Sequence, residues 1–219
     1  MRLRNLITAI SLAAAMLVGS SHVEAAEVTV SIITDKPLGL GATHGLGKVT
    51  DALQAKGFDV RRVAAPKAEK GNILIVAGLG DGSGHASKLL EATDTKLPEG
   101  PEALAIKNTT LDGIRTLLVA GSDDRGLMYA LLDVADRIGW STERNDPLSE
   151  VREVIEKPFM PERALSIYTM HRSTFESFFY DEAYWAAYLD MLAENRFNTF
   201  ALLLGYENWG YFAPPYPFF

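Results

Sequence analysis

Four consecutive residues after a short apolar run carry side chains that could bind a hydroxyl-rich ligand: Tyr206, Glu207, Asn208 and Trp209. A carboxylate and an amide can bind sugar hydroxyls through hydrogen bonds, and an indole can stack on a sugar ring. The same residues also suit an ordinary loop packed by aromatic side chains, so both interpretations stay open. Three residues after an earlier apolar run rank next as candidates: Tyr168, His171 and Arg172.

The segment Tyr180 to Gly205 would position the first group, because it is typical of a helix followed at once by a strand. Asp181 is a good N-cap, and Glu182 adds negative charge in the first turn, where the helix dipole favours it. Thr199 to Leu204 predicts a strand covered on both faces. Apolar residues recur at helical spacing before it: Tyr184, Trp185, Tyr188, Leu189 and Leu192.

Arg163 to Thr169 predicts another strand upstream, and strand, helix, strand is the repeating unit of a parallel α/β sheet or barrel. The chain before Arg163 predicts a separate α/β module with a mixed sheet and helices. Runs of β-branched and aliphatic residues predict its strands at 28–33, 58–63, 72–77, 104–107 and 114–120. Its predicted helices are Gly45 to Lys56, Ser83 or His85 to Leu90, and Asp123 or Asp124 to Gly139.

The first 25 residues are typical of a signal peptide. Arg2 and Arg4 precede an apolar run, Leu6 to Val18, that is too short to span a bilayer comfortably. Small or aliphatic residues predict cleavage after Ala25, and an N-terminal membrane anchor is the alternative. We therefore expect a secreted or periplasmic protein with no stable membrane anchor after cleavage. Because the chain has no cysteine, its fold must rest on an apolar core without disulfides.

The charge of the chain argues against two classes of partner. Loss of Arg2, Arg4 and Glu24 with the leader changes the formal net charge from −7 to −8. An acidic chain without a basic cluster is a poor ligand for nucleic acid and for anionic membranes. No nucleic-acid partner is therefore expected, and the sequence leaves the oligomeric state open.

Two glycine clusters raise the question of a nucleotide site. One follows a strand at 78–84, and the other precedes a helix at 39–47. A phosphate site uses backbone N–H groups at a helix N-terminus, but neither cluster has the Gly-x-Gly-x-x-Gly or Gly-Lys-Ser/Thr pattern. Glycine-rich turns are therefore expected instead. His44 and His85 lie in these clusters without a third ligand nearby, so no metal and no other cofactor is predicted.

The segment 121–131, GSDDRGLMYAL, combines a strand end, a turn and a helix. Its residues suit structural roles, since Asp124 can cap, Gly126 permits close packing, and Tyr129 can pack on the sheet. The segment resembles the last strand and helix of the non-catalytic N-terminal α/β domain in family 20 β-N-acetylhexosaminidases and in family 67 and 115 α-glucuronidases. Those families carry "G-x-D-x-R-G-x-x-Y-A/G-L" there, followed by a "D-R-I-G" like residues 136–139.

The following stretches extend this resemblance over nearly all of the mature chain. Residues 161–168, PERALSIY, resemble the "P-x-R-G" of the first barrel strand, although Ala164 replaces the glycine. Residues 192–200, LAENRFNTF, resemble the "M-A-x-x-K/R-x-N" that leads into the second strand. Family 20 enzymes usually continue with "H-W-H-x-x-D", whereas this chain has ALLLG at 201–205. Its last residues look more like relatives near the α-glucuronidases.

After the predicted signal peptide at 1–25, the resemblance implies an accessory α/β domain at 26–157 and the start of a (β/α)8 barrel at 158–219. A complete barrel needs roughly 250 residues, so 158–219 would hold about one and a half of the eight βα units. The expected fold class is thus an α/β domain followed by a truncated TIM barrel. Catalytic carboxylates would lie beyond Phe219, with none in this chain.

The resemblance also implies a role for Arg163, because the matching arginine of family 20 binds sugar hydroxyls; a salt bridge at the domain interface is the alternative. The expected substrate is a carbohydrate. The expected function is that of an N-terminal fragment of an exported glycoside hydrolase, inactive by itself. The other interpretation is a self-contained exported carbohydrate-binding or interaction module without enzymatic activity.

Overall fold

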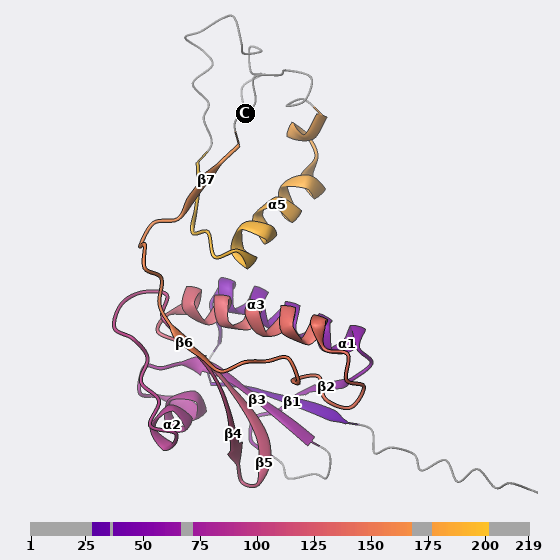
Figure 1. The fold of residues 1–219 in the computed structure, drawn as a ribbon, viewed down its shortest axis with the longest axis vertical. Helices are drawn as coiled ribbons and strands as arrows, with labels where there is room; N and C mark the ends of the chain where they lie inside the picture. Colours follow the sequence, from indigo (N-terminus) through magenta and orange to yellow (C-terminus); the bar gives the residue numbers. More distant parts are fainter. Residues whose placement is uncertain (1–27, 36, 67–71, 168–176, 202–219) are drawn as a thin grey trace, which may run out of the picture.

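The computed structural model describes residues 28–35, 37–66, 72–167 and 177–201, which form an N-terminal unit and a smaller βαβ unit (Figure 1). The N-terminal unit has a six-stranded mixed sheet in the order β2-β1-β3-β5-β4-β6. Its strands are β1 (Thr29–Thr34), β2 (Asp59–Arg62), β3 (Asn72–Leu79), β4 (Leu104–Leu111), β5 (Ile114–Gly121) and β6 (Val154–Glu156). β1, β2, β3 and β5 run parallel, while β4 is antiparallel to both of its neighbours.

Helices cover both faces of this sheet (Figure 1). They are α1 (Leu40–Ala55), α2 (Gly84–Ala92) and α3 (Asp124–Trp140). α1 and α3 pack together on one face, and α2 packs on the other. Successive residues of β3 therefore enter different cores: Ile75 joins the α1–α3 side, and Leu74 and Val76 join the α2 side. A strand covered on both faces needs a continuous apolar run, as Asn72–Leu79 supplies.

The βαβ unit consists of β7 (Ala164–Ser166), α5 (Glu182–Glu194) and β8 (Thr199–Ala201). β7 and β8 are parallel, with Ala164 opposite Thr199. Asp181 caps α5 as predicted, because its carboxylate accepts the N–H of Tyr184 at 3.1 Å. The strand predicted at 199–204 to be covered on both faces is half-buried over its described part, Thr199–Ala201, and residues 202–204 lie outside the described residues. β7 is exposed. Leu192 is the buried residue of α5, and its aromatic residues are half-buried.

Most elements of the N-terminal unit were predictable, and the differences have local causes. α1 begins at Leu40 rather than Gly45, because a distant carboxylate caps it. β4 and β5 extend to a tight turn at Asp112 and Gly113, which both have positive φ, as a two-residue hairpin turn requires. α3 continues past Gly139 to Trp140. β6, which the sequence did not indicate, adds an edge strand beside β4.

The α/β fold with a mixed sheet is thus confirmed, whereas the barrel stays a prediction. The described residues supply one strand–helix–strand repeat of the kind that barrels use. The predicted leader at 1–25 lies outside the described residues. Within the residues that are described, no helix is long and apolar enough to cross a membrane.

Candidate functional site at the junction of the two units

Arg163, the described member of the predicted site, lies just before β7 and binds the N-terminal unit. Its guanidinium donates to the carbonyl of Arg196 at 2.6 Å, to the carbonyl of Met160 at 2.8 Å, and to the carboxylate of Glu102. Only 17% of the Arg163 side chain is exposed. The salt bridge left open as an alternative is therefore formed, and sugar binding by Arg163 remains a prediction.

Glu102 is the centre of this junction, and the sequence analysis missed it. Its carboxylate is buried and accepts hydrogen bonds from Arg125 at 2.8 Å, from Asn198 at 3.0 Å and from Arg163. Its backbone has φ 60°, the left-handed region, and its N–H donates to Asp123 at 2.9 Å. Glu102 lies in a connection between elements with no helical or strand periodicity, so no sequence pattern could have singled it out.

The charges at the junction favour an ionised carboxylate. Burial raises the pKa of Glu102, but hydrogen bonds from Arg125, Asn198 and Arg163 outweigh burial, so the pKa lies below its ordinary value. Burial, followed by the Glu102 charge, raises the pKa of Tyr129. A general acid or base works best with a pKa near the working pH. Glu102 is therefore suited to hold donors in place and unsuited to transfer protons.

The residues that carry the family resemblance meet at this same junction. Asp123 caps α3 by accepting the N–H of Gly126 at 2.7 Å. A Cβ on Gly126 would lie 2.4 Å from the carbonyl oxygen of Ala103, so only glycine lets α3 approach this close. The Tyr129 hydroxyl donates to the carbonyl of Phe197 at 3.3 Å, across to the βαβ unit. The motif thus positions α3 against two segments: the connection that contains Ala103, and the βαβ unit at Phe197.

The junction lies at the amino ends of β7 and β8, since Arg163 and Asn198 each precede a strand. The carboxyl ends of both strands point away from the N-terminal unit (Figure 1). In parallel α/β folds and barrels, ligands bind at the carboxyl ends of strands. The other predicted candidates follow those ends in the sequence but lie outside the described residues: Tyr168, His171, Arg172, Tyr206, Glu207, Asn208 and Trp209.

A second polar contact joins α1 to α5. Lys48 binds Asp190 at 2.7 Å and Glu194 at 3.6 Å, and His44 Nε2 lies 3.4 Å from Asp190. The hydrogen bond that Lys48 donates to Asp190 is the largest of the causes that raise the pKa of Lys48. These side chains are about one-third exposed, so the contact is weaker than the one at Glu102.

The two glycine clusters make room for carboxylates of the chain itself. Asp124 accepts the N–H groups of Gly41 and Ala42 at the start of α1, and a Cβ on Gly39 would lie 2.4 Å from its carboxyl carbon. Asp35 is placed in the same way at the start of α2, where it accepts the N–H groups of residues 85 and 86. Protein carboxylates therefore occupy the positions that a phosphate would need.

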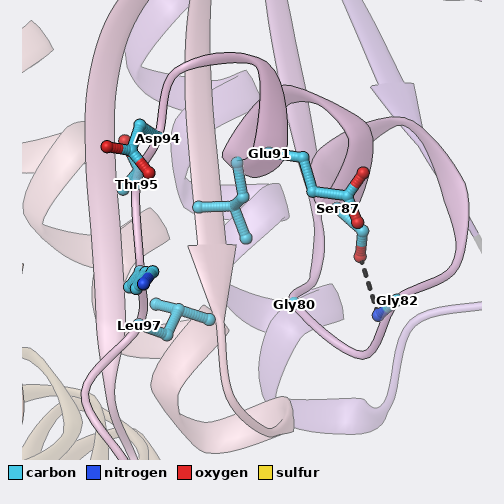
Figure 2. A pocket seen from close by; sticks show the side chains of 9 residues that line it. Gly80, Gly82, Ser87, Glu91, Asp94, Thr95 and Leu97 are labelled. Atoms are coloured by element: carbon cyan, nitrogen blue, oxygen red, sulfur yellow. Dashed lines mark hydrogen bonds between the residues drawn. The ribbon is translucent and has the colours of Figure 1, made fainter.

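A cavity of about 540 Å³ lies beside the glycine cluster at 78–84, between the β3–α2 turn and residues 94–97 (Figure 2). Its polar wall is largely satisfied internally, since Ser87 accepts the N–H of Gly82 and donates to the carbonyl of Leu79. Glu91, Asp94 and Lys96 also line it, so carboxylates outnumber ammonium groups in its wall, which disfavours an anion. Among the described residues, no group of three potential ligands could hold a metal ion.

Comparisons with known proteins agree with this architecture. No family model and no curated protein matches the chain. Among solved structures, a GH138 enzyme targeting pectin rhamnogalacturonan II matches 79% of this chain with a TM-score of 0.51 and 22% identity. CpGH84D matches 63% of the chain with a TM-score of 0.46 and 10% identity. The chain spans 18% of the length of the GH138 enzyme and 22% of CpGH84D. The fold of this chain thus resembles part of the GH138 enzyme.

Proposed function

We propose that this chain is the N-terminal part of an exported glycoside hydrolase that acts on poly- or oligosaccharides. Such an enzyme adds water across an O-glycosyl bond, so that one sugar gains a hydroxyl and the other keeps the bridging oxygen. The observation that carries the proposal is the likeness in fold to the GH138 enzyme over 79% of the chain, a share too large for the N-terminal unit alone. Because ALLLG at 201–205 departs from the family 20 pattern, the motif resemblance is nearer to relatives of the α-glucuronidases than to β-N-acetylhexosaminidases.

The position of the junction supports the same proposal. The N-terminal unit binds the amino ends of β7 and β8 and leaves their carboxyl ends clear. Catalytic groups of barrel enzymes lie at those carboxyl ends. A glycosidase of the usual type also needs two carboxylates about 5–10 Å apart across a closed site. We therefore place the substrate at the far end of the βαβ unit and the catalytic carboxylates on further strands of a longer protein.

The test is release of a chromophore from aryl hexosaminides, glucuronides and hexosides by the 219-residue chain and by a longer protein that contains it. We expect turnover by the longer protein only. If Glu207 and Trp209 bind sugar, Glu207→Gln or Trp209→Ala in that protein should raise the activation free energy for kcat/KM by about 1–3 kcal/mol. This is the cost of losing one buried hydrogen-bond partner. Glu182→Gln, on the first turn of α5, serves as the control.

Two results would contradict the proposal. Turnover by the 219-residue chain, abolished by Glu207→Gln, would show that this chain is a complete enzyme. Absence of turnover by both proteins, together with saturable binding of an oligosaccharide, would favour a carbohydrate-binding module instead.

A further inference from the structure

The described strands of the βαβ unit have limited apolar packing to fix their alignment. β7 is exposed, and the described part of β8 is half-buried, with Phe200 packed against Trp185 and Tyr188 of α5. A one-residue slip in register moves every side chain of a strand to the other face, and burial normally prevents such a slip. Because burial is weak here, another interaction must specify why Ala164 lies opposite Thr199.

Arg163 and Asn198 make that interaction at the amino ends of the strands. The N–H of Arg163 donates to the Asn198 side-chain oxygen at 2.9 Å. The carbonyl of Arg163 accepts the N–H groups of Asn198 at 3.1 Å and Thr199 at 3.2 Å. These bonds form together only when β7 and β8 are aligned as observed.

Both residues are in turn held by the carboxylate of Glu102. The Arg163 guanidinium donates to one oxygen of this carboxylate. The Asn198 amide donates to the other oxygen at 3.0 Å. The carboxylate itself is fixed, because the N–H of Glu102 is bound by Asp123, the cap of α3. Arg125 supplies a third donor from within the N-terminal unit. A rigid acceptor on one unit thus meets paired donors on the other.

We propose that Glu102 is a positioning residue through which the N-terminal unit sets the register of β7 and β8. The partner that this surface of the N-terminal unit recognises is the pair of strand starts, Arg163 and Asn198. The arrangement is independent of any catalytic activity and depends only on contacts between described residues. It predicts that loss of the carboxylate loosens both strands together, although Glu102 belongs to neither.

Hydrogen exchange on the full chain, followed by mass spectrometry, tests this proposal. Glu102→Gln keeps the size of the side chain but replaces one acceptor oxygen with a donor. We expect roughly tenfold faster exchange at 160–167 and at 195–201, the change that follows loss of a charge-assisted hydrogen bond. Exchange in β3, in the core of the N-terminal unit, should stay unchanged. Arg163→Met should give the same pattern. Exchange at 160–167 and 195–201 should be no faster in the double variant, Glu102→Gln with Arg163→Met, than in either single variant.

Arg115→Met is the control, because it removes an arginine ion pair, with Asp146, that lies within the N-terminal unit and does not involve Glu102. It should leave exchange at 160–167 and 195–201 unchanged. If Glu102→Gln does not fold, Arg163→Met decides, because it removes the bond to Glu102 and leaves the contacts between the Arg163 backbone and Asn198: faster exchange in both strands supports the proposal. Unchanged exchange in either folded variant, additive effects of Glu102→Gln and Arg163→Met, or an equal effect of Arg115→Met would overturn the proposal.

Discussion

Carboxylates packed beside glycines explain the two glycine clusters, which in the sequence raised the question of a nucleotide site. Asp124 is the first residue of α3, yet it caps α1, and the glycines at 39 and 41 leave space for it. His44, which the sequence placed in a glycine cluster, lies inside α1 and faces Asp190. The glycine clusters are therefore places where the start of a helix packs closely against a carboxylate of the same chain.

The cap on α1 predicts the effect of Asp124→Ala. Its loss leaves the N–H groups of Gly41 and Ala42 without their acceptor, which should lower the free energy of unfolding by about 1–2 kcal/mol. Urea unfolding followed by circular dichroism measures this change. Asp51→Ala, at an exposed position of α1, is the control and should change stability by less than about 0.5 kcal/mol. Equal effects of the two substitutions would show that the cap contributes nothing.

Glu102 predicts a dependence of stability on pH. Its pKa is lower in the folded protein than in the unfolded chain, so its contribution to stability is complete above the unfolded pKa. That contribution is lost as the pH falls through the lower, folded pKa. The free energy of local unfolding of the βαβ unit should therefore differ between the natural chain and Glu102→Gln by about 1.5 kcal/mol at about pH 7, and this difference should shrink below about pH 4. A difference in hydrogen exchange at 160–167 and 195–201 that stays constant from neutral to acidic pH would contradict this assignment.

At the scale of elements, the sequence predicted what periodicity and composition encode. The apolar positions of α3, Leu127 to Ile138, are buried as expected, and the β3 run is the buried strand. The start of α1 and the existence of β6 were missed, because both depend on partners far away in the chain: Asp124 for the helix and β4 for the strand. At the junction, the motif singled out Arg163, whose predicted sugar binding stays a prediction, whereas Glu102 lies in a connection and offered no pattern.

The capped helices also predict that the chain binds no nucleotide. Asp35 already accepts the N–H groups that would bind a phosphate at the start of α2, and its charge repels an anion. Calorimetric titration with adenosine and nicotinamide nucleotides, and with inorganic phosphate, should give no saturable heat. Micromolar binding that disappears in Gly80→Val would show that the cluster at 78–84 is a phosphate site.

At the scale of the whole molecule, the two units differ in how completely they bury their apolar residues. The N-terminal unit has continuous cores on both sides of its sheet. In the βαβ unit, Leu189 and Leu165 are exposed by 49% and 36%. The smaller unit therefore depends on its neighbour, through the contacts at Glu102 and Lys48.

This difference predicts how separate pieces behave. Residues 26–157, which include β6, should unfold cooperatively when expressed alone, whereas residues 158–219 should not fold. Circular dichroism of both pieces and hydrogen exchange of the whole chain provide the measurements. Cooperative unfolding of 158–219 alone, or equal protection of both units in the whole chain, would be the contrary result.

The order of Glu102 and Arg163 along the chain has a consequence for synthesis. Arg163 follows Glu102 by 61 residues, and ribosomes add about 5–20 residues per second. Glu102 is thus made about 3–12 s before the arginine that binds it, by the same rates. During that interval, the strands and helices that hold the carboxylate have time to form, since such events take microseconds to milliseconds. The later segment can then dock, as it is made, on a surface that is already complete.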